Sequence, residues 1–161
     1  MCQLNKIPIS VCELHARDEF AWRQLWAAYL DFYGAAISAE VTEHTWECIL
    51  DPDGPIFGRI AMVGDLAAGF AICVVHEATW SIRPTCYLED LFVDPAARGA
   101  GVGRALLSDL VAIGQARGWG SVYWHTRADN ARARQLYDQY VSADDFVRYR
   151  LSIQPWTNEP L

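Results

Sequence analysis

The sequence predicts an α/β fold in which one mixed sheet is flanked by helices. Apolar segments of strand-like composition first follow one another as a meander and then alternate with segments of helical periodicity, the order expected of a layered α/β domain. At 161 residues and 52% hydrophobic content, the chain can bury one core. No repeat or linker interrupts residues 1–161, so we expect a single domain.

The first part of the chain is expected to hold a strand and two helices. A strand over residues 7–14 precedes a helix that Asp18 can cap and that ends before Gly34. A second helix over 38–50 stops at the proline- and glycine-rich residues 51–55.

A hairpin and a further strand follow. Gly64-Asp65 separates the apolar segments 56–63 and 66–75 and is a dipeptide typical of a tight hairpin turn. The apolar residues 85–93 predict the next strand. Because no helix separates these segments, we expect them to form the meander.

Helices and strands alternate in the last part of the chain. Apolar residues recur at helical spacing over 101–117. A strand over 121–126, a helix over 130–141 and a last strand over 146–153 are expected next. Residues 156–161 are expected to form a loose tail.

Charge is distributed unevenly along the chain. Residues 1–97 carry five basic and fourteen acidic side chains, a net charge of −9, whereas residues 98–161 carry eight basic and six acidic ones, a net charge of +2. The first part therefore favours a cationic partner and the second an anionic one, unless the acidic surface serves only solubility. The overall charge of −7 argues against a nucleic-acid partner, which needs a basic surface.

Cysteine and apolar patterns indicate a cytoplasmic protein without a metal. The five cysteines have no C-x-x-C spacing, which suits reduced thiols, and the four histidines show no spacing typical of metal ligands. The longest apolar run, 66–75, is too short to span a bilayer, and residues 1–14 lack the pattern of a secretory leader. We therefore expect no metal cofactor and no membrane partner.

The most informative stretch is a glycine-rich loop between a strand and a helix, Arg98-Gly99-Ala100-Gly101-Val102-Gly103-Arg104. Free backbone N–H groups and the positive end of a helix dipole meet there, an arrangement that binds phosphate. A Walker A loop would need Gly-Lys-Ser/Thr where Arg104-Ala105 stands, and a dinucleotide fingerprint would need a small residue at 104. We therefore expect a phosphate-bearing ligand of another class.

Asn130, Ala133 and Tyr137 lie on one face of the helix that follows, and spacing alone favours a core position for Tyr137 over one in a cleft. Together with the glycine-rich loop, Asn130 and Tyr137 make the chain resemble the GCN5-related N-acetyltransferase (GNAT) superfamily. Tyr87–Val93 and Val122-Tyr123-Trp124 resemble its branch of polyamine, small-amine and histone acetyltransferases.

The resemblance covers residues 66–147 and implies a fold and a division of labour. The fold would be a mostly antiparallel sheet with a splayed fork, flanked by helices. Residues 1–60 would lie on the acceptor side, and 85–141 would form the acetyl-CoA-binding core. The superfamily often has a glycine-aromatic pair after the tyrosine helix, whereas 141–146 contain no glycine. This departure affects the register of the last strand.

The resemblance also implies acetyl-CoA as co-substrate and gives each motif a role. The loop Arg98–Arg104 would bind its pyrophosphate, and Leu91-Phe92-Val93 would pair with the pantetheine arm as an added strand does. Asn130 would hydrogen-bond that arm, and Ala133 would leave room for it. Tyr137 would lie near the sulfur and protonate the departing thiolate, in place of the core position that spacing favours.

The chemistry also needs a base, since a protonated amine cannot attack a thioester. In a regular strand Glu89 shares a face with Leu91, so we expect Glu89 to act as base, directly or through a water, unless it pairs with an arginine. Asp90 would point to the opposite face. A covalent route through Cys86 is disfavoured because no histidine is near it in sequence, and His125 is either an auxiliary base or a hydrogen-bonded edge residue.

Aromatic residues at helical steps mark the first helix: Trp22, Trp26, Tyr29 and Tyr33. Such a stripe is typical of core packing. GNAT enzymes usually line their acceptor site with the first two helices, so the alternative is that Tyr29 or Tyr33 joins Trp80 and Glu89 around a cationic acceptor.

We therefore expect a cytoplasmic enzyme that transfers an acetyl group from acetyl-CoA directly to a primary amine, preferably a small cationic amine or a polyamine. One alternative is a protein lysine or N-terminal acetyltransferase, which would act on a peptide amine. Another is a non-catalytic CoA-binding sensor, which would need neither Glu89 nor Tyr137. Homodimers are common in the superfamily, but no segment marks an interface, so a homodimer is left open.

Overall fold

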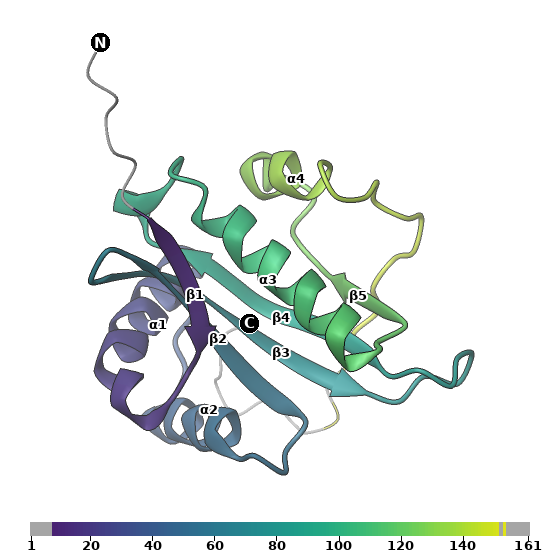
Figure 1. The fold of residues 1–161 in the computed structure, drawn as a ribbon, viewed down its shortest axis with the longest axis horizontal. Helices are drawn as coiled ribbons and strands as arrows, with labels where there is room; N and C mark the ends of the chain where they lie inside the picture. Colours follow the sequence, from purple (N-terminus) through teal and green to yellow (C-terminus); the bar gives the residue numbers. More distant parts are fainter. Residues whose placement is uncertain (1–7, 152, 154–161) are drawn as a thin grey trace.

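The computed structural model describes residues 8–151 and 153 of the chain, and its centre is a five-stranded sheet (Figure 1). The strands lie in the order of the sequence: β1 (Ile9–Glu13), β2 (Ile56–Val63), β3 (Leu66–His76), β4 (Thr85–Val93) and β5 (Ser121–Trp124). Neighbours are antiparallel except for β4 and β5, which are parallel. The expected mixed, mostly antiparallel sheet is therefore confirmed.

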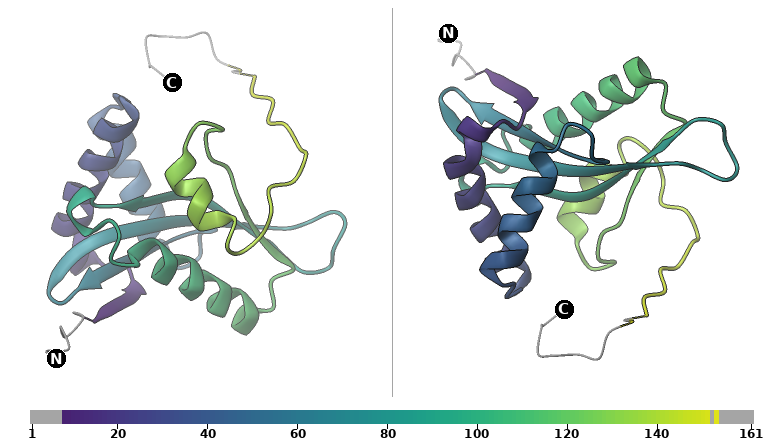
Figure 2. Two further views of the ribbon diagram at one scale, coloured as in Figure 1. Left: turned by 90° about the horizontal axis from the view of Figure 1, so that it is seen from above. Right: turned by 90° about the horizontal axis from the view of Figure 1, so that it is seen from below.

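Four α-helices flank the sheet: α1 (Glu19–Tyr33), α2 (Ala39–Leu50), α3 (Val102–Arg117) and α4 (Ala131–Tyr137). Helices α1 and α2 cover one face, and α3 covers the other (Figure 2). Short 3-10 turns precede α1 and α3, at Ala16–Asp18 and Pro95–Ala97. No helix among the described residues is long and apolar enough to cross a membrane.

Asp18 stands at the predicted cap position of α1, but its side chain makes a hydrogen bond other than the expected one. Asp18 precedes the helix as predicted, but its carboxylate accepts a hydrogen bond from the His15 N–H at 3.0 Å and none from the first turn of α1. The next helix is capped directly, because Ser38 Oγ accepts from the Val41 N–H at 3.3 Å. Gly34, at φ 62°, ends α1 as expected.

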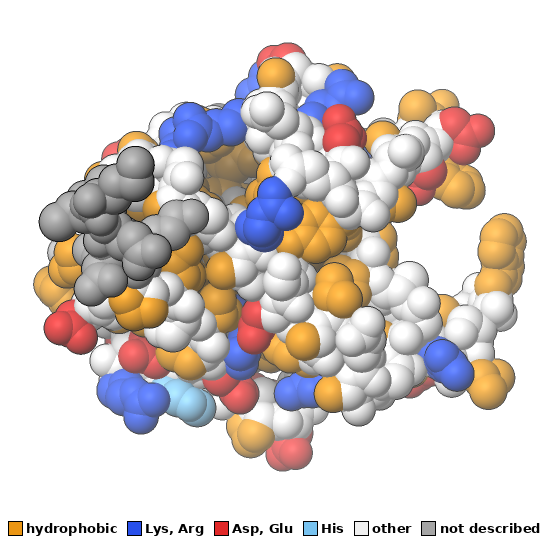
Figure 3. All heavy atoms as spheres, turned by 45° about the horizontal axis from the view of Figure 1, so that its top comes forward, with side chains coloured by type: hydrophobic (Ala, Val, Ile, Leu, Met, Phe, Trp, Pro, Cys, Tyr) orange, Lys and Arg blue, Asp and Glu red, His pale blue; other side chains and the backbone are white. Residues whose placement is uncertain are grey.

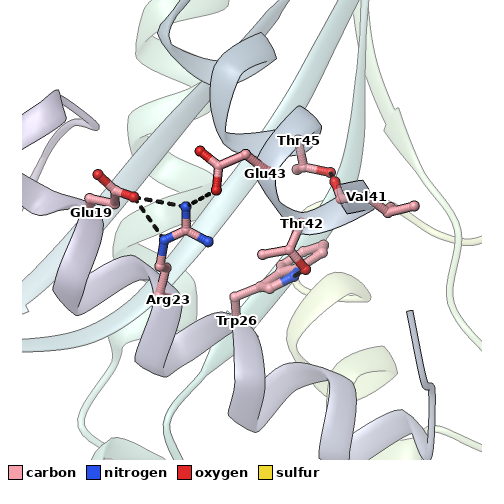
Figure 4. A network of polar contacts seen from close by, with 7 residues as sticks. All are labelled: Glu19, Arg23, Trp26, Val41, Thr42, Glu43 and Thr45. Atoms are coloured by element: carbon pink, nitrogen blue, oxygen red, sulfur yellow. Dashed lines mark hydrogen bonds and ion pairs between the residues drawn. The ribbon is translucent and has the colours of Figure 1, made fainter. Parts of the chain in front are cut away.

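Aromatic side chains hold α1 and α2 together on their face of the sheet. Trp22 stacks on Trp26 and Trp46, with ring centroids 5.3 and 4.8 Å apart. At the surface, Arg23 bridges the carboxylates of Glu19 and Glu43 at 2.8 and 2.5 Å (Figure 4). The core interpretation of the stripe therefore holds for Trp22 and Trp26, which are 0% and 7% exposed.

The last predicted strand is wrong for the described part of the chain. Residues 146–151 form no strand, and the Phe146 N–H bonds only the Asp144 carboxylate, at 3.3 Å. The chain leaves α4 and runs away from the sheet (Figure 2). Its apolar side chains are exposed: Phe146, Val147, Tyr149, Leu151 and Ile153. Residues 1–7 and 154–161, with the expected tail, lie outside the described residues.

Candidate active site

A β-bulge in β4 decides which side chains face which side of the sheet. Asp90 pairs with Ile72 and Leu88 with Cys73, so Glu89 has no partner on β3. Leu88 packs in the core between the sheet and α3, which we call the α3 core. Phe92 packs in the core between the sheet and α1, the α1 core, although the two residues are four positions apart. Regular alternation would have placed them on one face.

The bulge also changes the expectation that Glu89 shares a face of the sheet with Leu91. Leu91 and Val93 pack against the α3 core, as Leu88 does, so alternation is interrupted at Glu89 and does not assign it to the face of Leu91 and Val93. The Glu89 side chain is exposed and has no ion-pair partner among the described residues. Asp90 lies on the face opposite Leu91, as predicted.

The sheet opens into a fork on the other side of β4. Pairing between β4 and β5 ends at Leu88 and Trp124, so the backbone from Glu89 to Val93 has no neighbouring strand on that side. The predicted fork is therefore confirmed. An unpaired strand edge of this kind can accept the backbone-like amides of an extended ligand.

The glycine-rich loop runs from the end of β4 to the start of α3. Gly99 and Gly101 adopt φ values of 91° and 101°, which disfavour residues with a Cβ. The first intrahelical hydrogen bond is donated by the Ala105 N–H to the Gly101 carbonyl at 2.9 Å, so the N–H groups of 102–104 precede it and have no partner within the helix. A Cβ at Gly99 would meet nothing within 4 Å, so the loop has open space beside it.

Loop, fork and α4 enclose one cleft of about 1010 Å³. Every residue predicted to bind the co-substrate lines it: Leu91, Phe92, Val93, Arg98, Gly99, Ala100, Gly101, Val102, Gly103, Arg104, Asn130, Ala133 and Tyr137. Basic side chains border a hollow on the face that carries α4 (Figure 3). The volume, the free N–H groups and the surrounding arginines fit a long ligand with a pyrophosphate, such as acetyl-CoA.

Arg98 is held at the junction of β4, α1 and the loop. Its Nε donates a hydrogen bond to the Val93 carbonyl at 3.1 Å. Its guanidinium lies 5.2 Å from the ring centroid of Phe32 and 5.9 Å from that of Phe92. A fixed cation therefore stands next to the free N–H groups of the loop.

Asn130 has a local role that the sequence also indicates. Its Oδ1 accepts from the Ala133 N–H at 3.2 Å and caps α4, while its Nδ2 donates to Thr126 Oγ1 at 3.2 Å. Asparagine one residue before a helix is a usual cap, so the helix boundary could have revealed this role. Its contact with the pantetheine arm stays a prediction.

Tyr137 is packed against the core and also faces the cleft, the two positions considered for it. Its ring packs against Trp124, with centroids 5.3 Å apart, and it also lines the cleft. Burial raises the pKa of Tyr137 to about 12, and the neighbouring Tyr33 adds to the rise. The phenol therefore keeps its proton at neutral pH and can donate it.

The predicted acceptor residues separate in space. Tyr33 lines the cleft, and Tyr29 packs edge-on against Tyr33 at 5.0 Å. Trp80 is 98% exposed on the β3–β4 connection, at the start of β4, whereas the cleft lies at the end of that strand. Figure 2 shows this connection projecting from the body of the molecule. The three aromatic residues therefore do not form one pocket within the chain.

The structure adds a contact that sequence reasoning missed. The Tyr29 hydroxyl donates a hydrogen bond to Asp90 Oδ1 at 2.5 Å, across 61 residues of sequence. Burial raises the pKa of Asp90 to about 6; the hydrogen bond from Tyr29 lowers it, and the charge of Glu89 raises it. The contact could have been predicted only with knowledge of the bulge, because the bulge turns Asp90 toward α1.

The other reactive residues considered have ordinary surroundings. Cys86 is buried in the α3 core, and no histidine among the described residues hydrogen-bonds it. His125 Nδ1 lies 3.4 Å from the Tyr87 hydroxyl, as a hydrogen-bonded edge residue would. No group of three or more metal-binding side chains occurs in the described part of the chain.

Comparisons with known proteins identify the family. The Acetyltransferase (GNAT) family model matches residues 21–141. The D-amino-acid N-acetyltransferase HPA3 of Saccharomyces cerevisiae is 34% identical over 145 residues, which cover 88% of this chain and 89% of that protein.

Solved structures show the same fold. An aminoglycoside acetyltransferase, meta-AAC0020, from an uncultured soil metagenomic sample has a TM-score of 0.77 at 16% identity, over 94% of this chain and 100% of that one. AAC(6')-Iy in complex with a CoA bisubstrate analog has a TM-score of 0.76 at 20% identity, over 90% and 99% of the two chains. The chain belongs to the GNAT family and is an acetyltransferase that uses acetyl-CoA as co-substrate.

Proposed function

We propose that this enzyme acetylates the primary amine of a small cationic molecule, by direct transfer while both substrates are bound. The observation that carries the proposal is the single cleft in which the glycine-rich loop, the unpaired edge of β4 and Tyr137 meet. A cleft that holds the thioester beside a free strand edge and a phenol allows an amine to attack without a covalent enzyme intermediate.

Each part of the cleft has a role in this proposal. The N–H groups at the start of α3, with Arg98 and Arg104, bind the pyrophosphate of acetyl-CoA. The free edge of Leu91 and Val93 hydrogen-bonds the pantetheine arm, which fixes the position of the thioester. Tyr137 donates its proton to the thiolate that leaves as CoA.

Charge and relatives support a small cationic acceptor. The net charge of −9 over residues 1–97 attracts cations to the part of the chain that holds α1 and α2. The relative HPA3 is named a D-amino-acid N-acetyltransferase, and the structural neighbour meta-AAC0020 is named an aminoglycoside acetyltransferase. D-amino acids and aminoglycosides are small molecules with an amine, and the 34% identity to HPA3 supports a small-amine acceptor.

Calorimetric titration with acetyl-CoA, followed by thiol release over a panel of amines, tests the proposal. The panel contains polyamines, aminoglycosides, D- and L-amino acids and lysine peptides. We expect micromolar binding and CoA release with a small cationic amine. CoA release with peptides alone would show that the acceptor is a protein and not a small amine. Absence of acetyl-CoA binding would overturn the proposal.

A further inference from the structure

Asp90 is a carboxylate in an apolar setting with no cation to balance it. Its only hydrogen-bond partner among the described residues is the Tyr29 hydroxyl, and it takes part in none of their ion pairs. The Tyr29 ring in turn lies against Phe70 and Phe92, with centroids 5.7 and 5.9 Å away. A partly buried charge without a counter-charge destabilises a fold, so this arrangement needs a reason other than stability.

The bulge at Glu89 is what creates this arrangement. It turns Asp90 toward α1, where the pair formed by Tyr29 and Asp90 joins the helix to β4. A core leucine at 90 would pack there without the penalty of a charge. Residues that a fold keeps at the expense of stability concentrate at functional sites.

One oxygen of Asp90 remains available to a ligand. Tyr29 occupies Oδ1, and no described residue hydrogen-bonds Oδ2. The only enclosed side-chain polar atom without a partner in the described residues is Trp22 Nε1, so Oδ2 is not sealed from solvent. A positively charged group that reached Oδ2 would supply the missing counter-charge.

The Tyr29–Asp90 pair lies next to the cleft. Asp90 directly precedes Leu91, and Tyr29 contacts Tyr33; both Leu91 and Tyr33 line the cleft with Tyr137. The ionisable groups that act on the pair or on Tyr33 are Glu89 from β4 and Arg127 from the connection before α4. Asp90 is the carboxylate among them that a hydrogen bond holds in place.

We propose that Asp90, and not Glu89, binds the ammonium group of the acceptor and takes its proton, with Tyr29 as the positioning residue. This inference rests on the proposed function. Oδ2 of Asp90 accepts one proton from R–NH3+, which leaves R–NH2 to form the C–N bond as the C–S bond of acetyl-CoA breaks. The second proton leaves the nitrogen with formation of the amide, and the thiolate gains one from Tyr137. One proton is released overall.

The protonation behaviour of Asp90 suits this role. Because burial raises its pKa to about 6, Asp90 is a carboxylate at neutral pH and a stronger base than an exposed aspartate. The aromatic rings of Tyr29 and Tyr33 add faces that attract an alkylammonium group. The ligand class is therefore a primary aliphatic ammonium.

The test compares Asp90→Asn with Glu89→Gln, the competing candidate for the base, in the whole enzyme with the amine identified above. We expect Asp90→Asn to lower kcat/KM at least about 100-fold and to leave acetyl-CoA affinity within about twofold. Glu89→Gln should stay within about threefold of wild type. The reverse order of the two variants would overturn the inference and return the base to Glu89.

A pH profile of Tyr29→Phe separates positioning from structure. Since the Tyr29 hydrogen bond lowers the pKa of Asp90, its removal should move the acid limb of kcat/KM to higher pH, by about half a unit or more. A limb that stays in place would overturn the positioning role, even if Asp90→Asn fails to fold. A wild-type enzyme that releases no CoA with any amine would instead contradict the proposed function.

Discussion

Tyr137 combines enclosure with access to a reacting group. Its ring is fixed against Trp124, and its hydroxyl has no hydrogen-bond partner among the described residues, so the proton is free to move to a ligand. Because burial raises the pKa of Tyr137 to about 12, the phenol keeps its proton at neutral pH.

Replacement of Tyr137 by Phe should therefore slow the chemical step. We expect kcat to fall by about 100-fold, with acetyl-CoA affinity almost unchanged, because only the proton donor is lost. Tyr149→Phe is the matched control, since Tyr149 is 90% exposed on the segment after α4. Unaltered kcat under conditions where chemistry limits the rate would give Tyr137 a packing role alone.

Gly101 tests the phosphate site. Gly101→Asp adds a carboxylate beside the free N–H groups and should weaken acetyl-CoA binding at least about 100-fold through charge repulsion. Gly118→Asp places the same side chain at a second left-handed position, φ 71°, at the end of α3, and should leave binding unchanged. Both should lose about 1 kcal/mol of stability from backbone strain. Calorimetry and thermal unfolding measure the two effects, and equal affinities would contradict the site.

At the scale of elements, an ion pair ties β2 to α3. Arg59 Nε lies 2.7 Å from Asp109 Oδ2, and Arg59 Nη2 donates to Oδ1 at 3.0 Å. The two side chains are only 14% and 21% exposed, so neither charge is well hydrated without the other. The pair fixes α3, and with it the loop, over the sheet.

Arg59→Met should therefore lower the free energy of unfolding by about 2–3 kcal/mol, because Asp109 is left unpaired. The double variant Arg59→Met with Asp109→Leu should recover most of that loss, since it removes both charges. Urea unfolding with a double-mutant cycle measures the difference. Additive losses would show that the pair is not coupled.

The limits of sequence reasoning also appear at this scale. The bounds of β2 and β4 agree with the prediction because turn residues and apolar composition mark them locally. The bulge was missed because it depends on the pairing with β3, which no local pattern contains. The last strand was wrong because alternation of apolar residues over 146–153 says which face they would present, not whether an edge accepts them.

The candidate site divides in the same way. The glycine-rich loop could be predicted from its own residues, whereas the strand end and the helix face of the cleft were predicted from the resemblance to the GNAT superfamily. The contact of Tyr29 with Asp90 could not, because it joins α1 to a bulged strand. Trp80 lies apart from the cleft because its long connection extends beyond the sheet.

For the whole molecule, Asp90 links stability to pH. The pKa of Asp90 is about 6 in the folded protein and 3.8 as its reference value, so the native state binds this proton more tightly. Its contribution to stability is therefore present at low pH and is lost as pH rises from about 4 to about 6. The full change is about 3 kcal/mol.

Asp90→Asn removes this pH-dependent contribution to stability and keeps the shape of the side chain. The free energy of unfolding of the variant, relative to wild type, should therefore increase between pH 4 and pH 7 by up to about 3 kcal/mol. Urea unfolding of both proteins at each pH gives the difference, in which other titrating groups cancel. A constant difference would mean that Asp90 titrates normally.

The unpaired residue in β4 makes this strand one residue longer than the part of β3 that it faces. Any side chain can stand at 89 without moving its neighbours, since it pairs with nothing on β3. Deletion of residue 89 would make Leu88 and Asp90 neighbours opposite Cys73 and Ile72, which restores strict alternation and leaves Asp90, Leu91 and Phe92 on their present faces. Position 89 can therefore be changed or removed without turning the side chains that follow it, whereas removal of Asp90 or Leu91 would exchange their order on the two faces.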